Sequence, residues 1–61
     1  MTIIHTVTYT QRAVDGALVE QTARLIRSHH LTLVRCQQIL RKQHQTLNLF
    51  VVRVEAMIEA R

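Results

Sequence analysis

The first ten residues form two alternating sets, as expected where an extended chain directs successive side chains to opposite faces. Threonine, valine and isoleucine dominate this stretch and favour a strand, which we expect over residues 1–12. The rest of the chain has no second run that alternates as regularly. We therefore expect this short strand, or arm, to pair with its own copy in a partner chain. Its two sides consist of Ile3, His5, Val7 and Tyr9, and of Ile4, Thr6, Thr8 and Thr10.

Residues 16–61 follow a helical pattern instead. Gly16, behind Asp15, is expected where the chain leaves the strand and enters a helix, with Asp15 as the N-cap. No proline and no further glycine follow. The pattern predicts one long helix or a helical hairpin, and every seventh position is aliphatic: Val19, Ile26, Leu33, Leu40, Leu47 and Val54.

The helical region has two places for a break, at 28–31 and at 43–48. Ser28 is a candidate cap for a second helix at the first place, and Thr46 at the second. The fold class expected is mainly α: a short N-terminal strand followed by a helical hairpin or one long helix. Residues 1–61 are expected to form a single small domain.

A chain of 61 residues buries only a marginal core, so association is expected to stabilise it. Its single cysteine, Cys36, excludes an intramolecular disulfide. The heptad positions and their companions therefore predict a homo-oligomer, expected to be a dimer with a coiled-coil contact. The predicted oligomer interface consists of Val19, Ile26, His30, Leu33, Leu40, His44, Leu47, Val51, Val54 and Ile58.

The charge balance is basic, with a net charge of +4. Every formal charge between Gln21 and Val54 is positive, and the four carboxylates lie outside that stretch. Exposed arginine and lysine side chains bind phosphates, so this stretch predicts a helical surface for DNA or RNA. The predicted nucleic-acid-binding residues are Arg24, Arg27, Arg35, Arg41 and Lys42.

The order of the elements, with "TIIHTVTYT" followed by helices, resembles the ribbon-helix-helix regulators. In that family a short N-terminal strand pairs with that of the dimer mate, and its outward side chains read the major groove. The resemblance implies that Thr6, Thr8 and Thr10 face the nucleic acid. It also implies that Val7 and Tyr9 turn inward.

Two further readings stay open. The chain is also consistent with a helical protein-interaction module, such as an adaptor, an antitoxin-like protein or a phage-type inhibitor, that docks on a larger protein. The apolar flank of this module would include Leu18, Leu25, Phe50 and Val52. The third hypothesis is a structural assembly protein that binds neither nucleic acid nor another protein.

Enzymatic, metal and cofactor chemistry are not expected. No two of His29, His30, Cys36 and His44 have the spacing of three or four residues that lets helical ligands share a metal ion. The sequence has no glycine-rich phosphate loop and no activated nucleophile motif. It also lacks a secretory leader and a membrane-spanning run, so we expect a cytoplasmic protein that makes no membrane contact.

Overall fold

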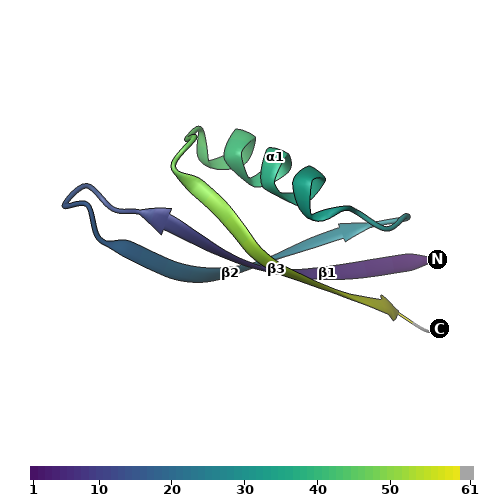
Figure 1. Cartoon of the computed structure of the whole chain (residues 1–61). Coiled ribbons are helices and arrows are strands. Elements are labelled where there is room, and N and C mark those ends of the chain that lie inside the picture. The colour runs from purple at the N-terminus through teal and green to yellow at the C-terminus, as the bar shows by residue number, and fades with distance from the viewer. Residues whose placement is uncertain (60–61) are drawn as a thin grey trace.

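The computed structural model describes residues 1–59 as a three-stranded antiparallel sheet with one helix on one of its faces (Figure 1). The elements are β1 (Thr2–Arg12), β2 (Leu18–Arg27), α1 (Leu33–His44) and β3 (Leu49–Glu59). The strand order is β2-β1-β3. The prediction of a mainly α fold is therefore wrong, and so are the helical hairpin and the coiled coil. Strand β1 has both edges occupied by strands of its own chain, which corrects the expected pairing between chains.

Strands β1 and β2 form a hairpin, and its turn lies where the sequence predicted the start of a helix. Gly16 N donates to Ala13 O across 2.9 Å, and Ala13 N donates to Ala17 O across 2.7 Å. Gly16 has a φ of 88°, a conformation that favours glycine. Asp15 closes the turn because its Oδ1 accepts from Ala17 N. A three-residue loop with glycine at its left-handed position is a common hairpin connection.

Helix α1 begins and ends at side-chain and backbone caps. Thr32 Oγ1 accepts from Arg35 N across 3.1 Å at the start. At the other end Gln45 adopts the left-handed conformation with a φ of 53°, and Thr46 N donates to Arg41 O. This arrangement satisfies carbonyl groups that the last turn leaves free. The break expected at 28–31 thus falls in the loop before α1, and the one at 43–48 covers the last two residues of α1 and the loop after it. Both separate a helix from strands rather than two helices.

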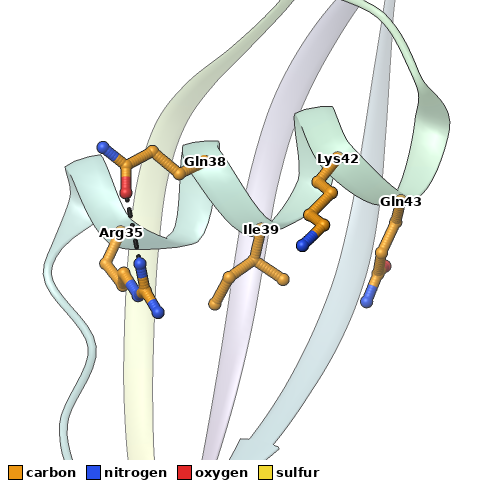
Figure 2. A pocket seen from close by; sticks show the side chains of 5 residues that line it. All are labelled: Arg35, Gln38, Ile39, Lys42 and Gln43. Carbon is orange, nitrogen blue, oxygen red and sulfur yellow. Dashed lines mark hydrogen bonds between the residues drawn. The ribbon is translucent and has the colours of Figure 1, made fainter.

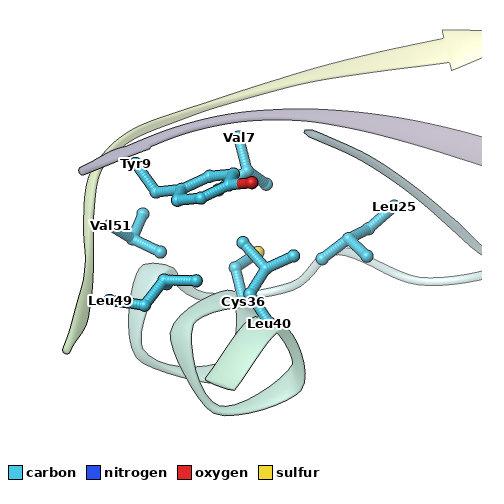
Figure 3. Close-up of a cluster of buried hydrophobic side chains, with 7 residues drawn as sticks. All are labelled: Val7, Tyr9, Leu25, Cys36, Leu40, Leu49 and Val51. Atoms are coloured by element: carbon cyan, nitrogen blue, oxygen red, sulfur yellow. The ribbon is translucent and has the colours of Figure 1, made fainter. Parts of the chain in front are cut away.

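The core lies between α1 and the face of the sheet that carries Val7 and Tyr9 (Figure 3). Both of these side chains are buried. They share one face of β1, as the alternation of the first ten residues predicts. Cys36 and Leu40 come from successive turns of α1 and pack onto them. The buried cluster consists of Val7, Tyr9, Leu25, Cys36, Leu40, Leu49 and Val51.

No element of the described chain covers the opposite face of the sheet, which we call the open face (Figure 1). Directly paired residues of neighbouring strands share a face, so the register assigns its members. One bulge interrupts the register of β3, where Val52 is the extra residue between the partners of Thr8 and Tyr9. The open face consists of Thr2, Ile4, Thr6, Thr8, Thr10 and Arg12, of Leu18, Glu20, Thr22, Arg24 and Ile26, and of Phe50, Arg53, Glu55, Met57 and Glu59.

Candidate nucleic-acid interface

The charged side chains divide unequally between the two sides of the sheet. Glu20, Glu55 and Glu59 lie on the open face, and Asp15 lies in the hairpin turn. Within residues 1–59, α1 and the helix-facing side of the strands, together called the helix side, therefore carry no carboxylate. A phosphate group that approaches the helix side meets only cationic and neutral groups, which favours its binding.

One flank of α1 is fixed to β3 by two side chains. Gln37 Oε1 accepts from Val51 N across 3.0 Å, and Arg41 Nε donates to Leu49 O across 2.8 Å. These two bonds satisfy backbone groups at the start of β3, which is an edge strand of the sheet. They also set the rotation of the helix about its axis.

The other flank of α1 faces away from β3 and carries a cationic groove. At about 100° per residue, Arg35, Ile39 and Lys42 point roughly opposite to the β3-bound flank. With Gln38 and Gln43 they line a hollow of about 400 Å³. Figure 2 shows Arg35, Ile39, Lys42 and Gln43 on one side of the helix, with Gln38 reaching toward Arg35 from the adjacent edge. We call these five residues the cationic groove.

The groove combines groups that suit a phosphate backbone. Arg35 and Lys42 are separated by two turns, or about 10.5 Å along the helix axis, so they can contact different phosphates. Gln38 Oε1 accepts from Arg35 Nη1 across 3.4 Å, a long bond that leaves the guanidinium exposed. Ile39 packs partly into the core and forms the apolar part of the lining.

Arg27 lies on the helix side as well, at the end of β2, where its side chain is half-buried. Its Nη1 donates to Ile26 O across 2.8 Å. Burial raises the pKa of the Cys36 thiol, and the nearby Arg27 charge partly opposes that rise. Arg27 is therefore close to the first turns of α1, and it adds positive charge to the helix side.

The five cations predicted from the sequence do not form one surface. The structure brings Arg35 and Lys42 together in the groove and leaves Arg27 near the start of the helix. Arg41 binds Leu49 O, and its guanidinium carbon lies 5.1 Å from the Phe50 ring centroid, so its main contacts are structural. Arg24 lies on the open face, on the opposite side of the sheet.

Thr6, Thr8 and Thr10 lie on the open face, so the structure separates them from the groove. They share that face with carboxylates as well as cations, for example in the row that Arg24, Thr6 and Glu55 form across the sheet. The ribbon-helix-helix arrangement itself is absent from residues 1–59, because β1 is the central strand of its own sheet and a single helix follows the hairpin.

The predicted oligomer interface is scattered over the molecule. Leu40 and Val51 are buried in the core, and Val54 packs against it. Val19 and Ile26, seven residues apart, lie on opposite faces of β2 because a strand has a period of two. The other members, on α1, in the loops and at the end of β3, are exposed: His30, Leu33, His44, Leu47 and Ile58.

The groups with redox or metal-binding chemistry do not converge. Cys36 is a buried free thiol, and His29, His30 and His44 are exposed. Within residues 1–59, no group of three or more histidine, cysteine or carboxylate side chains could hold a metal ion. The fourth histidine, His5, is fully buried and bonded at both ring nitrogens.

Sequence reasoning missed three members of the groove, namely Gln38, Ile39 and Gln43. The signal for them was present, because together with Arg35 and Lys42 they have the spacing of three, four, seven and eight residues that shares one helix flank. It was hidden by the longer heptad series, which assigned the same segment to a buried contact.

Comparisons with protein-family models, with curated proteins and with solved structures found no match to this chain. Among the described residues, no helix has the length and apolar character needed to cross a membrane.

Proposed function

We propose that this protein binds nucleic acid through the cationic groove of α1, with Arg35 and Lys42 as the principal phosphate ligands and Arg27 as an added cation. The observation that carries the proposal is the position of the carboxylates, since residues 1–59 place none of them on the helix side. Binding without a catalytic step is the activity proposed, consistent with a small regulator.

The groove supports backbone contact more than base readout. Arginine offers a planar group that bonds two phosphate oxygens, and lysine a compact point charge. Gln38 and Gln43 add neutral donors for phosphate or sugar oxygens. Contacts of this kind position a protein on nucleic acid and carry little sequence information. We therefore expect binding that depends strongly on salt and weakly on sequence.

Fluorescence anisotropy with labelled duplex DNA, single-stranded DNA and RNA tests the proposal. Titrations between about 50 and 200 mM salt give the slope of log K against log salt, which is about −0.9 per duplex phosphate contact. Arg35→Gln and Lys42→Gln should each weaken binding and each reduce the magnitude of that slope by about 1. The double substitution should reduce it by about 2.

The matched control is Arg12→Gln, which removes one exposed positive charge near the hairpin turn, away from the groove. It should change the slope by less than about 0.3, because loss of net charge alone removes no phosphate contact. The proposal is wrong if the protein shows no retention at about 50 mM salt. It is equally wrong if Arg12→Gln has the same effect as the groove substitutions.

Docking on a larger protein stays a second candidate, because many large apolar side chains are exposed, including Leu18, Val34, Leu47 and Val52. Leu25, which the sequence placed on the docking flank, is buried in the core. A pull-down that survives nuclease treatment and recovers one stoichiometric protein, lost on Val52→Ser, would favour this candidate. Recovery of nucleic acid alone would favour the groove.

A further inference from the structure

The open face is the largest surface of this molecule that no element of residues 1–59 covers. We propose that it binds a second copy of the chain, so that two sheets pack face to face around a two-fold axis parallel to β1. The proposal concerns the side of the sheet opposite the cationic groove, and it does not depend on nucleic-acid binding.

A row of apolar side chains crosses the open face from strand to strand. Ile4 of β1 pairs with Ile26 of β2 and with Met57 of β3, so the three side chains lie next to one another on the open face. Ile26 is 56% exposed and Met57 is 67% exposed. Apolar side chains exposed together on one face mark an interaction surface more strongly than scattered ones do.

The adjacent row of the open face carries opposite charges at its two ends. Thr6 pairs with Arg24 on β2 and with Glu55 on β3, so the row runs from positive through neutral to negative. Glu55 also contacts Arg53 across 3.2 Å, and both side chains are about two-thirds exposed. The side chain of Arg24 is exposed and makes no hydrogen bond or ion pair within residues 1–59.

With a two-fold axis parallel to β1, each of these two rows lies over the same row of the second copy and matches it in charge and polarity. This axis sets β2 of one copy against β3 of the other, so Arg24 faces Glu55 of the partner subunit, and the reverse pair forms as well. The same rotation sets Ile26 against Met57 of the partner subunit and Ile4 against its own copy. Residues of a two-fold interface must match in this reciprocal way.

The other in-plane axis, perpendicular to the strands through Thr8, matches less well. It would place Ile4 over Arg12 of the partner subunit, because both lie four residues from Thr8 along β1. The same axis would set Ile26 against Leu18 of the partner subunit and Arg24 against the partner's Glu20. It would set Glu55 against Phe50 of the partner subunit, so it pairs the two rows only along β2. The axis parallel to β1 is therefore the one that the side chains favour.

The size of the open face suits a weak dimer. The strands have 10 or 11 residues. A strand of that length is about 35 Å long and three strands span about 14 Å, so two such faces bury on the order of 1,000 Å². That area is near the lower limit for specific association. We expect a dissociation constant in the range of about 1–100 µM. The dimer would leave both cationic grooves exposed on its outer sides.

Sedimentation equilibrium between about 5 and 500 µM measures the assembly directly, from a protomer of 7.1 kDa to twice that mass. Ile26→Ser should raise the dissociation constant at least about tenfold. Val34→Ser is its matched control, since Val34 is 61% exposed on α1, away from the open face, and its loss should change the constant less than about twofold.

Charge reversal tests the axis itself. Arg24→Glu and Glu55→Arg should each raise the dissociation constant at least about tenfold, because each sets like charges against one another. The combination of both should restore it to within about threefold of the unsubstituted protein. Circular dichroism confirms that each variant is folded.

The proposal is overturned if the protein is a monomer at all concentrations. It is also overturned if the double variant has a dissociation constant as high as that of either single variant. Sedimentation measures the dimer without nucleic acid. Its result is therefore independent of the anisotropy experiment, and each proposal can fail without the other.

Discussion

The backbone amide of Leu31 donates a hydrogen bond to Nε2 of His5 across 2.9 Å. Nδ1 of the same ring lies 3.1 Å from Leu25 O. Because Nε2 accepts, Nδ1 carries the proton and donates, so this arrangement fits the neutral imidazole. One fully buried side chain of β1 thus joins β2 and the loop that leads into α1, and it holds the start of the helix over the sheet.

Substitution of His5 should therefore destabilise the fold strongly. His5→Leu leaves Leu31 N–H and Leu25 C=O without their partner, and we expect a loss of about 2–4 kcal/mol in the free energy of unfolding. Urea denaturation followed by circular dichroism measures it. The same substitution at exposed His29 should cost less than about 0.5 kcal/mol. Equal losses at both positions would contradict the role of His5.

Arg41 and Arg35 should have opposite roles, although both are arginines of α1. Arg41→Gln removes the bond to Leu49 O and the contact with the Phe50 ring, so it should lower the free energy of unfolding by about 1–2 kcal/mol. Arg35→Gln should leave that free energy within about 0.5 kcal/mol and weaken nucleic-acid binding instead. Denaturation and anisotropy of the same two samples compare these effects, and equal stability losses would refute the assignment.

The Cys36 thiol should react slowly in the folded protein. Burial raises its pKa, so at a given pH a smaller fraction is thiolate, the reactive form. Its side chain is also buried, so a reagent cannot reach the sulfur while the protein is folded. At pH 8 a disulfide reagent should modify Cys36 at least about 100-fold faster in urea than in buffer. Similar rates in the two solutions would show that the first turns of α1 are not packed on the sheet.

The left-handed residue that ends α1 offers a stabilising substitution. Gln45 has a φ of 53°, a conformation that costs a side chain about 1 kcal/mol and costs glycine little. Gln45→Gly should therefore raise the free energy of unfolding by about 0.5–1 kcal/mol. Gln38→Gly, inside the helix, should lower it by about 1 kcal/mol. Urea denaturation measures both changes in the free energy of unfolding, which should have opposite signs. A lower free energy of unfolding for Gln45→Gly would contradict the role of Gln45 as the helix cap.

Only part of this fold could be predicted from the sequence. The alternation of residues 1–12 gave both faces of β1 correctly, because β1 is the central strand and its residues Ile3, His5, Val7 and Tyr9 are all buried on one face. The pair Asp15 and Gly16 is also a strong hairpin signal, and its assignment as the start of a helix was the first error. That choice removed the partner strand of β1.

Strands β2 and β3 lack a clean period of two for physical reasons. β2 is an edge strand with apolar residues on both faces, Leu25 toward the core and Ile26 toward the open face. In β3 the bulge at Val52 shifts the alternation by one residue. The aliphatic residues spaced by seven then matched a heptad pattern, although that spacing alternates faces in a strand. The cationic groove was predicted in part, through Arg35 and Lys42, because the segment 33–44 is helical.

The central claim is that nucleic acid binds the helix side of the sheet, and chemical-shift mapping tests it most directly. The amide resonances of the ¹⁵N-labelled protein are followed as a short duplex is added at low salt. The account predicts the largest shifts at Arg35, Gln38, Ile39, Lys42 and Gln43 and small shifts along the open face. The largest shifts at Thr6, Thr8 and Arg24 would contradict it.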